Sequence, residues 1–154
     1  MTAFAVRPAT GESDLAACFA VRSEVFVVEQ SVPESIEYDA YDADAVHVLA
    51  VGPDGAALGT GRLLYGAAAL AKTGSEDIGS LGRLAVRKSA RGLGVGVALV
   101  RAIEAEAVRL GLSAVDLGAQ AHAVGFYERL GYVAYGPEFQ DAGIPHRAMR
   151  RALP

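Results

Sequence analysis

A glycine-rich turn is the segment of this sequence best suited to bind phosphate. It comprises Arg91, Gly92, Leu93, Gly94, Val95 and Gly96, between an apolar stretch expected to be a strand and one expected to be a helix. Glycine lets the backbone approach a ligand closely. A helix N-terminus adds unpaired N–H groups and partial positive charge. The combination predicts a pyrophosphate site.

Two common phosphate motifs do not fit this turn. A P-loop needs Lys-Ser or Lys-Thr after its last glycine, where Val97 and Ala98 stand. A dinucleotide fingerprint that starts at Gly92 would need glycine at position 97. Asp116 could imitate the acid that binds ribose, but the further glycine-rich element of a full dinucleotide fold is missing. A structural turn without a ligand remains the alternative.

Tyr127 is a candidate catalytic residue. It lies in the run Gly125–Tyr132, expected to be the end of a helix followed by a glycine cap. A phenol can act as a general acid, and a buried hydroxyl needs a partner. Phe126 and Leu130, four residues apart, are expected to face the core.

A general base is harder to assign from the sequence. His122 follows a predicted strand and titrates near neutral pH, although an exposed position would explain it equally well. Glu29 ends a predicted helix, where its charge opposes the helix dipole, so we expect a functional role for it. Asp39 and His146 are further candidates, and His47 is a weaker one because it opens an apolar strand.

An acid-rich run between residues 29 and 44 has two interpretations. Most charge runs are solvated loops, and we favour that reading for the run as a whole. The alternative is a pocket wall that attracts a cationic amine. The acids concerned are Glu29, Glu34, Glu37, Asp39, Asp42 and Asp44.

Composition excludes several function classes. The net charge of -4 argues against a nucleic-acid surface, which needs a dense basic face. Cys18 is the single cysteine and is expected to be a buried structural residue, so no internal disulfide is possible. The three histidines lack metal-ligand spacing, so no metal site is expected. No signal peptide or membrane-spanning run is recognisable, and a cytoplasmic location is expected.

The elements that would position these residues form one mixed α/β domain over 1–154. The residues between 66 and 79 are expected to be an irregular connection, and those between 137 and 145 a loop. Helices are expected at 12–28, 95–110 and 121–130, and strands at 3–7, 46–51, 56–65, 81–86, 114–117, 132–135 and 146–150.

Two motifs resemble the GNAT (GCN5-related N-acetyltransferase) superfamily. Arg91, Gly94 and Gly96 match its coenzyme A motif Arg/Gln-x-x-Gly-x-Gly/Ala, and residues 126–132 match its Phe-Tyr-x-x-x-Gly-Phe/Tyr run. The ElaA-like subgroup is resembled over most of the chain. The segments concerned are 21–30, 61–63, 82–86, 119–122 and 141–146, the last with Ala142 inserted into the subgroup's Asp-Gly-Ile-Pro-His run.

The resemblance implies a GNAT fold: a mixed central sheet of six to seven strands, splayed between strands four and five and flanked by helices. It implies direct transfer of an acetyl group from acetyl-CoA to a primary amine of a small molecule or peptide. A non-catalytic acyl-CoA-binding or sensor domain is the rival reading. A homodimer that pairs the strand 146–150 across two copies is a further possibility.

The resemblance also assigns residues. Backbone N–H groups of Leu84, Ala85 and Val86 are expected to meet the thioester, and Gln120 the pantetheine amide. Tyr127 would give a proton to the leaving sulfur. For the base, the residues themselves and not the resemblance point to His122 or Glu29. The remaining residues expected to bind coenzyme A are Arg91, Gly92, Leu93, Gly94, Val95, Gly96, Phe126 and, through its ring, Tyr127.

Overall fold

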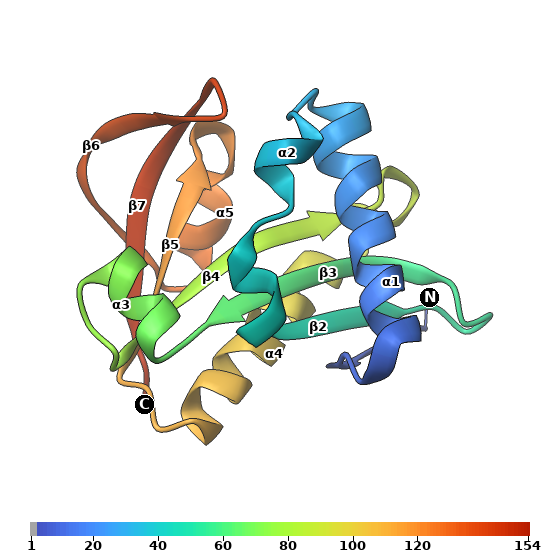
Figure 1. The fold of residues 1–154 in the computed structure, drawn as a ribbon, viewed down its shortest axis with the longest axis horizontal. Helices are drawn as coiled ribbons and strands as arrows, with labels where there is room; N and C mark the ends of the chain where they lie inside the picture. The colour runs from blue at the N-terminus through green and yellow to red at the C-terminus, as the bar shows by residue number, and fades with distance from the viewer. Residues whose placement is uncertain (1–2) are drawn as a thin grey trace.

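The computed structural model describes residues 3–154 and contains one seven-stranded sheet in the order β1-β2-β3-β4-β5-β7-β6 (Figure 1). Only β4 and β5 run parallel, and all other neighbours are antiparallel. The mixed sheet confirms the predicted fold class. The strands are β1 (Ala5–Pro8), β2 (Val46–Val51), β3 (Ala57–Leu64), β4 (Ile78–Val86), β5 (Ala114–Gln120), β6 (Val133–Asp141) and β7 (Ile144–Ala152).

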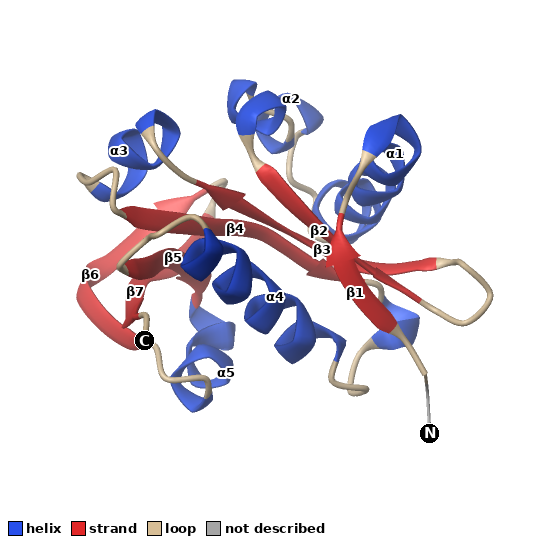
Figure 2. Cartoon of the chain, turned by 90° about the horizontal axis from the view of Figure 1, so that it is seen from below, coloured by secondary structure: helices blue, strands red, loops and turns tan. Residues whose placement is uncertain are grey.

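Helices cover both faces of the sheet (Figure 2). On one face lie α1 (Gly11–Arg22), α2 (Glu34–Glu37) and α3 (Ala67–Thr73), and on the other α4 (Val95–Arg109) and α5 (Val124–Arg129). Leu99 and Ile103 of α4 are fully buried in the larger apolar cluster, together with Val115 of β5 and Met149 of β7. This core fixes the strands that carry the site.

The splay between β4 and β5 begins after Leu81 and Leu117, the last residues that pair between these strands. Each strand continues beyond that point, to Val86 and Gln120. Backbone groups of the two extensions that point toward one another therefore have no partner strand. The prediction of a sheet splayed between strands four and five is confirmed.

A β-bulge in β4 re-aims its side chains. Gly82 pairs with Arg62 and Ala85 with Thr60, so that two residues of β4 stand opposite Gly61. Arg83 has a φ of +52°, which is unfavourable for a residue with a Cβ. Before the bulge Leu81 faces the α4 side, whereas beyond it Ala85 faces α1.

The N-terminal half differs from the expectation in two places. The predicted helix 12–28 is α1 followed by a π-helical segment, η1 (Ser23–Glu29), and the expected loop beyond it contains α2 and the 3₁₀ turn η2 (Ala40–Asp44). The predicted connection 66–79 contains α3, capped by Gly74 at a φ of +78°. Its Ala-rich run has strong helix propensity, which explains the helix.

The last two strands form a long hairpin instead of short strands around a loop. Ala142 and Gly143 both have positive φ and make its two-residue turn, so the inserted Ala142 is accommodated in a left-handed conformation. β7 lies between β5 and β6, which occupy both of its edges. The strand 146–150 therefore has no free edge with which to pair across a dimer, and a homodimer itself stays a prediction.

The N-terminal strand β1 is an edge strand of the sheet. Two short 3₁₀ turns, η3 (Lys88–Ala90) and η4 (Ala121–Ala123), precede α4 and α5. The predicted helix 121–130 is thus a 3₁₀ turn followed by α5. Among the helices of residues 3–154, none is long and apolar enough to cross a membrane.

Candidate active site

A cavity of about 740 Å³ lies in the splay between β4 and β5. A second hollow of about 530 Å³ adjoins it at the start of α4. Leu84, Val86, Arg91 and Phe126 border both. The predicted site residues that border at least one of the two are Glu29, Leu84, Ala85, Val86, Arg91, Gly92, Gly94, Val95, Gly96, Gln120, His122, Phe126 and Tyr127. Leu93 is exposed beside them and borders neither.

The N-terminus of α4 presents backbone N–H groups to the smaller hollow. Gly94 is its N-cap residue, with a φ of +84° and no side-chain capping bond. Gly92 has a φ of +79°, so both glycines take conformations that other residues avoid. A Cβ on Gly96 would lie 3.4 Å from the Phe126 ring. These features fit a bound pyrophosphate, because its oxygens can accept from the uncapped N–H groups.

Arg91 is held at the mouth of the cavity by Glu29. Its two terminal nitrogens each donate to one carboxylate oxygen of Glu29 at 2.7 Å, and its Nε donates to the Val86 carbonyl at 3.0 Å. The hydrogen bonds from Arg91 lower the pKa of Glu29. Both side chains are more than a third exposed. The ion pair with Arg91 explains why an acidic residue, Glu29, stands at the end of η1, and no catalytic role is needed for that explanation.

Tyr127 lies at the inner wall of the cavity. It is 7% exposed, and its ring makes edge-on contacts with Phe126 and Tyr132, at centroid distances of 5.0 and 5.9 Å. Burial raises the pKa of its hydroxyl well above the usual value. The phenol therefore keeps its proton at neutral pH, and its O–H is available as a hydrogen-bond donor on the cavity wall.

The other candidate bases separate by position. His122 and His146 border the cavity, whereas Asp39 and His47 do not. His122 is exposed, and His146 is 9% exposed with Nδ1 2.7 Å from the Ile144 carbonyl. A carbonyl only accepts, so Nδ1 carries the proton of the neutral ring and Nε2 is free to accept one.

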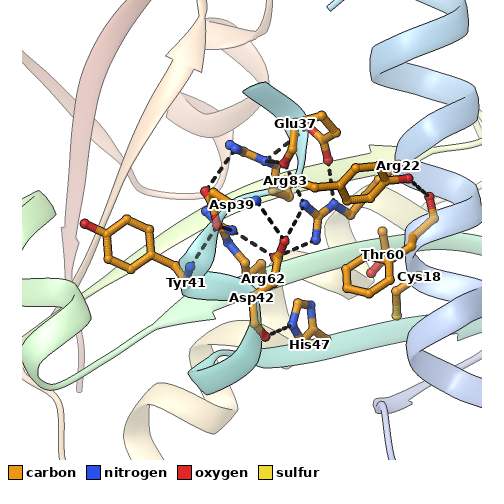
Figure 3. A network of polar contacts seen from close by, with 12 residues as sticks. Cys18, Arg22, Glu37, Asp39, Tyr41, Asp42, His47, Thr60, Arg62 and Arg83 are labelled. Carbon is orange, nitrogen blue, oxygen red and sulfur yellow. Dashed lines mark hydrogen bonds and ion pairs between the residues drawn. The ribbon is translucent and has the colours of Figure 1, made fainter. Parts of the chain in front are cut away.

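Half of the six acids in the acid-rich run are not solvated, and the expectation of a solvated loop is wrong for Glu37, Asp39 and Asp42. They form a buried network with three arginines from α1, β3 and β4 (Figure 3). The pairs are Arg22 with Glu37 and Asp42, Arg62 with Asp39 and Asp42, and Arg83 with Glu37 and Asp39, at 2.5–3.2 Å.

This network fixes the bulge of β4. The Nε of Arg83 lies 3.0 Å from the Glu37 carbonyl and 3.1 Å from its carboxylate, so α2 is tied to the strained residue beside Leu84. Asp39 and His47 belong to the same network, since the Asp42 carbonyl lies 3.0 Å from Nε2 of His47. Burial lowers the pKa of His47. Neither residue is placed to act on a substrate in the cavity.

Cys18 is fully buried, as the sequence indicated, and burial raises the pKa of its thiol. A group of three or more potential metal ligands is not found among residues 3–154. Nε2 of Gln120 donates a hydrogen bond to Oε1 of Gln30 at 2.8 Å. Gln30 directly follows η1, and both side chains border the cavity.

Tyr135, Phe139 and Arg150 were not predicted as site residues, yet they contact Asp116 and His146, which border the cavity. Asp116 of β5 accepts hydrogen bonds from the Tyr135 hydroxyl and, at 2.9 Å, from Nε of Arg150. Phe139 stacks on His146 at 5.7 Å. One signal was available, because Asp116 interrupts an apolar strand between Val115 and Leu117.

Comparison with known proteins agrees with this geometry. Residues 15–153 match the acetyltransferase (GNAT) domain family. The chain is 39% identical to the uncharacterized N-acetyltransferase YjcF of Bacillus subtilis over 93% of this chain and 96% of that protein. It is 34% identical to the structure of an acyl-CoA N-acyltransferase from Pseudomonas aeruginosa, with a TM-score of 0.81 over 99% of this chain and all of that one.

The structure of Escherichia coli ElaA is also similar, with a TM-score of 0.79 and 28% identity over 98% of this chain and 99% of that one. The resemblance to GNAT proteins and to their ElaA-like members is thereby confirmed. By name, the Pseudomonas aeruginosa protein is an acyl-CoA N-acyltransferase, and YjcF is an N-acetyltransferase. The chain belongs to the GNAT family of N-acyltransferases.

Proposed function

We propose that the protein transfers an acetyl group from acetyl-CoA to a primary amine of a small molecule or peptide by direct attack in a ternary complex. One observation carries this proposal. The splayed strands β4 and β5 open a cavity with the buried Tyr127 on its wall, and the hollow at the uncapped N-terminus of α4 adjoins this cavity. The hollow can hold the coenzyme A pyrophosphate, and the phenol can serve as proton donor to the departing sulfur.

The glycine-rich turn is proposed to hold the pyrophosphate. N–H groups at 94–97 supply hydrogen bonds, and Arg91 supplies charge once its side chain turns from Glu29 to phosphate. Leu84, Ala85 and Val86 lie on the unpaired edge of β4, where their backbone can meet the pantetheine arm and the thioester. Gln120 faces them from β5, and Phe126 packs beside the arm.

The donor supplies a thioester, whose carbonyl carbon the neutral amine attacks. A backbone N–H from 84–86 donates to the carbonyl oxygen as it becomes negative. As the C–S bond breaks, the Tyr127 hydroxyl donates its proton to the departing sulfur. The base takes one proton from the amine nitrogen, and that proton returns through solvent to the tyrosinate. The net change is amine plus thioester to amide plus thiol.

The base is proposed to be a histidine. His122 borders the cavity and is exposed, and His146 borders it with Nε2 free to accept a proton. Glu29 is less suited, because its pKa is lowered and its oxygens are held by Arg91. The variants His122→Gln and His146→Gln separate the two. Replacement of the true base should lower kcat by at least about a hundredfold. It should also remove the fall of kcat at acidic pH that protonation of the base causes.

Calorimetric titration with acetyl-CoA, coenzyme A and ATP tests the donor. Micromolar binding of both coenzyme A forms with little for ATP is expected, and Gly94→Glu should abolish it by placing a strained, anionic side chain in the turn. Equal affinity of Gly94→Glu would contradict the pyrophosphate site. Octanoyl-CoA as a second donor tests whether the acetyl group is preferred.

Release of free thiol with a panel of amines tests the transfer itself. Tyr127→Phe should lower kcat while the affinity for acetyl-CoA stays unchanged, because only the phenolic proton is removed. Undiminished turnover would remove Tyr127 from the mechanism. Binding of acetyl-CoA without thiol release for any amine would favour a non-catalytic acyl-CoA-binding domain instead.

A further inference from the structure

One face of the β5–β7–β6 region forms a hollow within the large cavity. Side chains alternate along a strand, so Asp116, Gly118 and Gln120 of β5 share a face. Their partners on β7 are Arg150, Ala148 and His146. Leu117 and Met149 point to the other face and are buried in the core.

The floor of this hollow is made of residues with little or no side chain. Gly118 is exposed, Ala148 stands opposite it, and Gly82 lies across the splay on β4. A Cβ on Gly82 would meet no atom within 4 Å. Phe139 forms one wall, since its ring lies 3.2 Å from where a Cβ on Gly118 would be. The floor is therefore open to a ligand and flanked by an aromatic ring.

Asp116 closes the end of the hollow away from the glycine-rich turn. It pairs with Ser80 of β4 just before the splay opens. The Tyr135 hydroxyl and Arg150 Nε both donate to its Oδ2. Oδ1 accepts from no side chain or backbone group among residues 3–154, and Asp116 borders the cavity. Arg150 and Asp116 also form an ion pair, at 2.9 Å, in which Asp116 uses Oδ2. The two donors thus orient the carboxylate, and its Oδ1 is left for a ligand.

The cations and acids around the hollow are mostly paired. Arg62 and Arg83 are bound by Asp39, Asp42 and Glu37 in the buried network. Lys72 lies over the Tyr41 ring, with its Nζ 5.0 Å from the ring centroid. A carboxylate oxygen only accepts, and its bonds to cationic donors are the strong ones.

We propose that Asp116 anchors a second, cationic group of the acceptor. The substrate class is then molecules with two amino groups, such as diamines. This rests on the proposed function and takes His146 as the base, so that the reacting amine lies beside His146 and its strand partner Gln120. These residues lie four positions along their strands from Asp116 and Arg150, a rise of about 13 Å. Allowing for side-chain reach, the two nitrogens should lie about 10 Å apart.

A length series tests the anchor. Thiol release from acetyl-CoA is measured with 1,4-diaminobutane, 1,6-diaminohexane and 1,8-diaminooctane, each against the n-alkylamine of equal length. We expect kcat/KM to favour the diamine by roughly tenfold to a hundredfold at one of the longer lengths, as a charge-assisted hydrogen bond provides. Equal values for diamine and monoamine at every length would overturn the proposal.

Asp116→Asn keeps the shape and should reduce that diamine preference to near one. The matched control is Asp44→Asn, because Asp44 is exposed and borders neither hollow. It should keep the wild-type preference. An unchanged preference in Asp116→Asn would also overturn the proposal. Ala148→Leu is a second variant. By filling the floor, it should weaken the longest diamines most, and circular dichroism of each variant verifies folding.

Calorimetric titration of the diamines into protein saturated with coenzyme A separates this proposal from the function on which it rests. If no amine is acylated but 1,6- or 1,8-diamines bind the wild type and not Asp116→Asn, the anchor stands and the transfer falls. If monoamines are acylated as well as diamines, the transfer stands and the anchor falls. Absence of both binding and preference would overturn the anchor.

Discussion

Two sets of arginine–carboxylate pairs border the cavity, and they differ in burial and in the number of partners. Arg22 and Arg62 are 1% and 3% exposed in their side chains, and each is bound by two carboxylates. Arg91 and Glu29 are 40% and 37% exposed and bind each other. Removing one residue from a buried, shared network leaves an unpaired buried charge and lowers stability strongly. An exposed pair can separate and bind other partners at little cost in free energy.

The two sets of arginine–carboxylate ion pairs connect different parts of the fold. The buried network ties α1, α2 and η2 to β3 and to the bulge of β4, and so holds the β4 edge that is proposed to face the thioester. The Arg91–Glu29 pair crosses the mouth between η1 and the glycine-rich turn. We infer that the first is a scaffold and the second a contact that gives way to phosphate.

Removing Arg22 should have the largest effect. Arg22→Met leaves the buried carboxylates of Glu37 and Asp42 without their main partner, and we expect a loss of about 3–5 kcal/mol in the free energy of unfolding. Urea denaturation followed by circular dichroism measures it. Arg109→Met, which breaks an exposed pair with Glu106 on α4, is the control and should be nearly neutral. Equal stability of both variants would show that the network is dispensable.

The network should also govern stability in acid. Burial acts to raise the pKa of Asp42, but hydrogen bonds from Arg22 and Arg62 outweigh it and lower that pKa to about 2. The stabilisation is therefore complete above pH ~4, where the unfolded carboxyl is also ionised, and is lost as pH falls through about 2. It amounts to roughly 2 kcal/mol.

Asp42→Asn measures this contribution. The difference in unfolding free energy between wild type and Asp42→Asn should shrink by roughly 2 kcal/mol between pH 4 and pH 2. Burial raises the pKa of Glu37, which works in the opposite direction at higher pH, so the comparison is made below pH 4. A difference that does not change with pH would contradict the ion pairing of Asp42.

Arg91→Ala should act on binding rather than on folding. Loss of a charged donor to pyrophosphate should weaken binding of coenzyme A by about tenfold or more, measured by calorimetry. The free energy of unfolding should change by about 1 kcal/mol or less, because the pair with Glu29 is exposed. A large stability loss with unchanged affinity would reverse the roles of the two regions.

Glu29→Gln should have the smallest effect, with the opposite sign. It removes the competitor for Arg91, so affinity for coenzyme A should rise by roughly twofold to fivefold, the worth of an exposed ion pair. The same variant tests Glu29 as the general base, since a base would lose about a hundredfold or more in turnover. A drop of that size would restore Glu29 to the mechanism.

Local features of the fold were predictable because they depend on neighbours in sequence. The strand, glycine turn and helix from Leu81 to Leu110, the hairpin at residues 52–55 and the glycine caps follow from apolar periodicity and left-handed glycine conformations. The helix α3 was missed although its Ala-rich run has strong helix propensity, because the run is short and lies between glycines. The extended hairpin β6–β7 had a weak local signal, and strand pairing decided it.

The segment from Arg91 to Gly96, the proposed coenzyme A end of the site, could be found from sequence because a helix N-terminus and its glycines form within one short segment. The proposed acceptor end depends on tertiary structure. Asp116, Tyr135 and Arg150 meet through the register of β5, β6 and β7, and Arg22, Arg62 and Arg83 meet their acids across 15 to 46 residues. Sheet register and buried charge pairing are long-range properties, and local sequence patterns do not encode them.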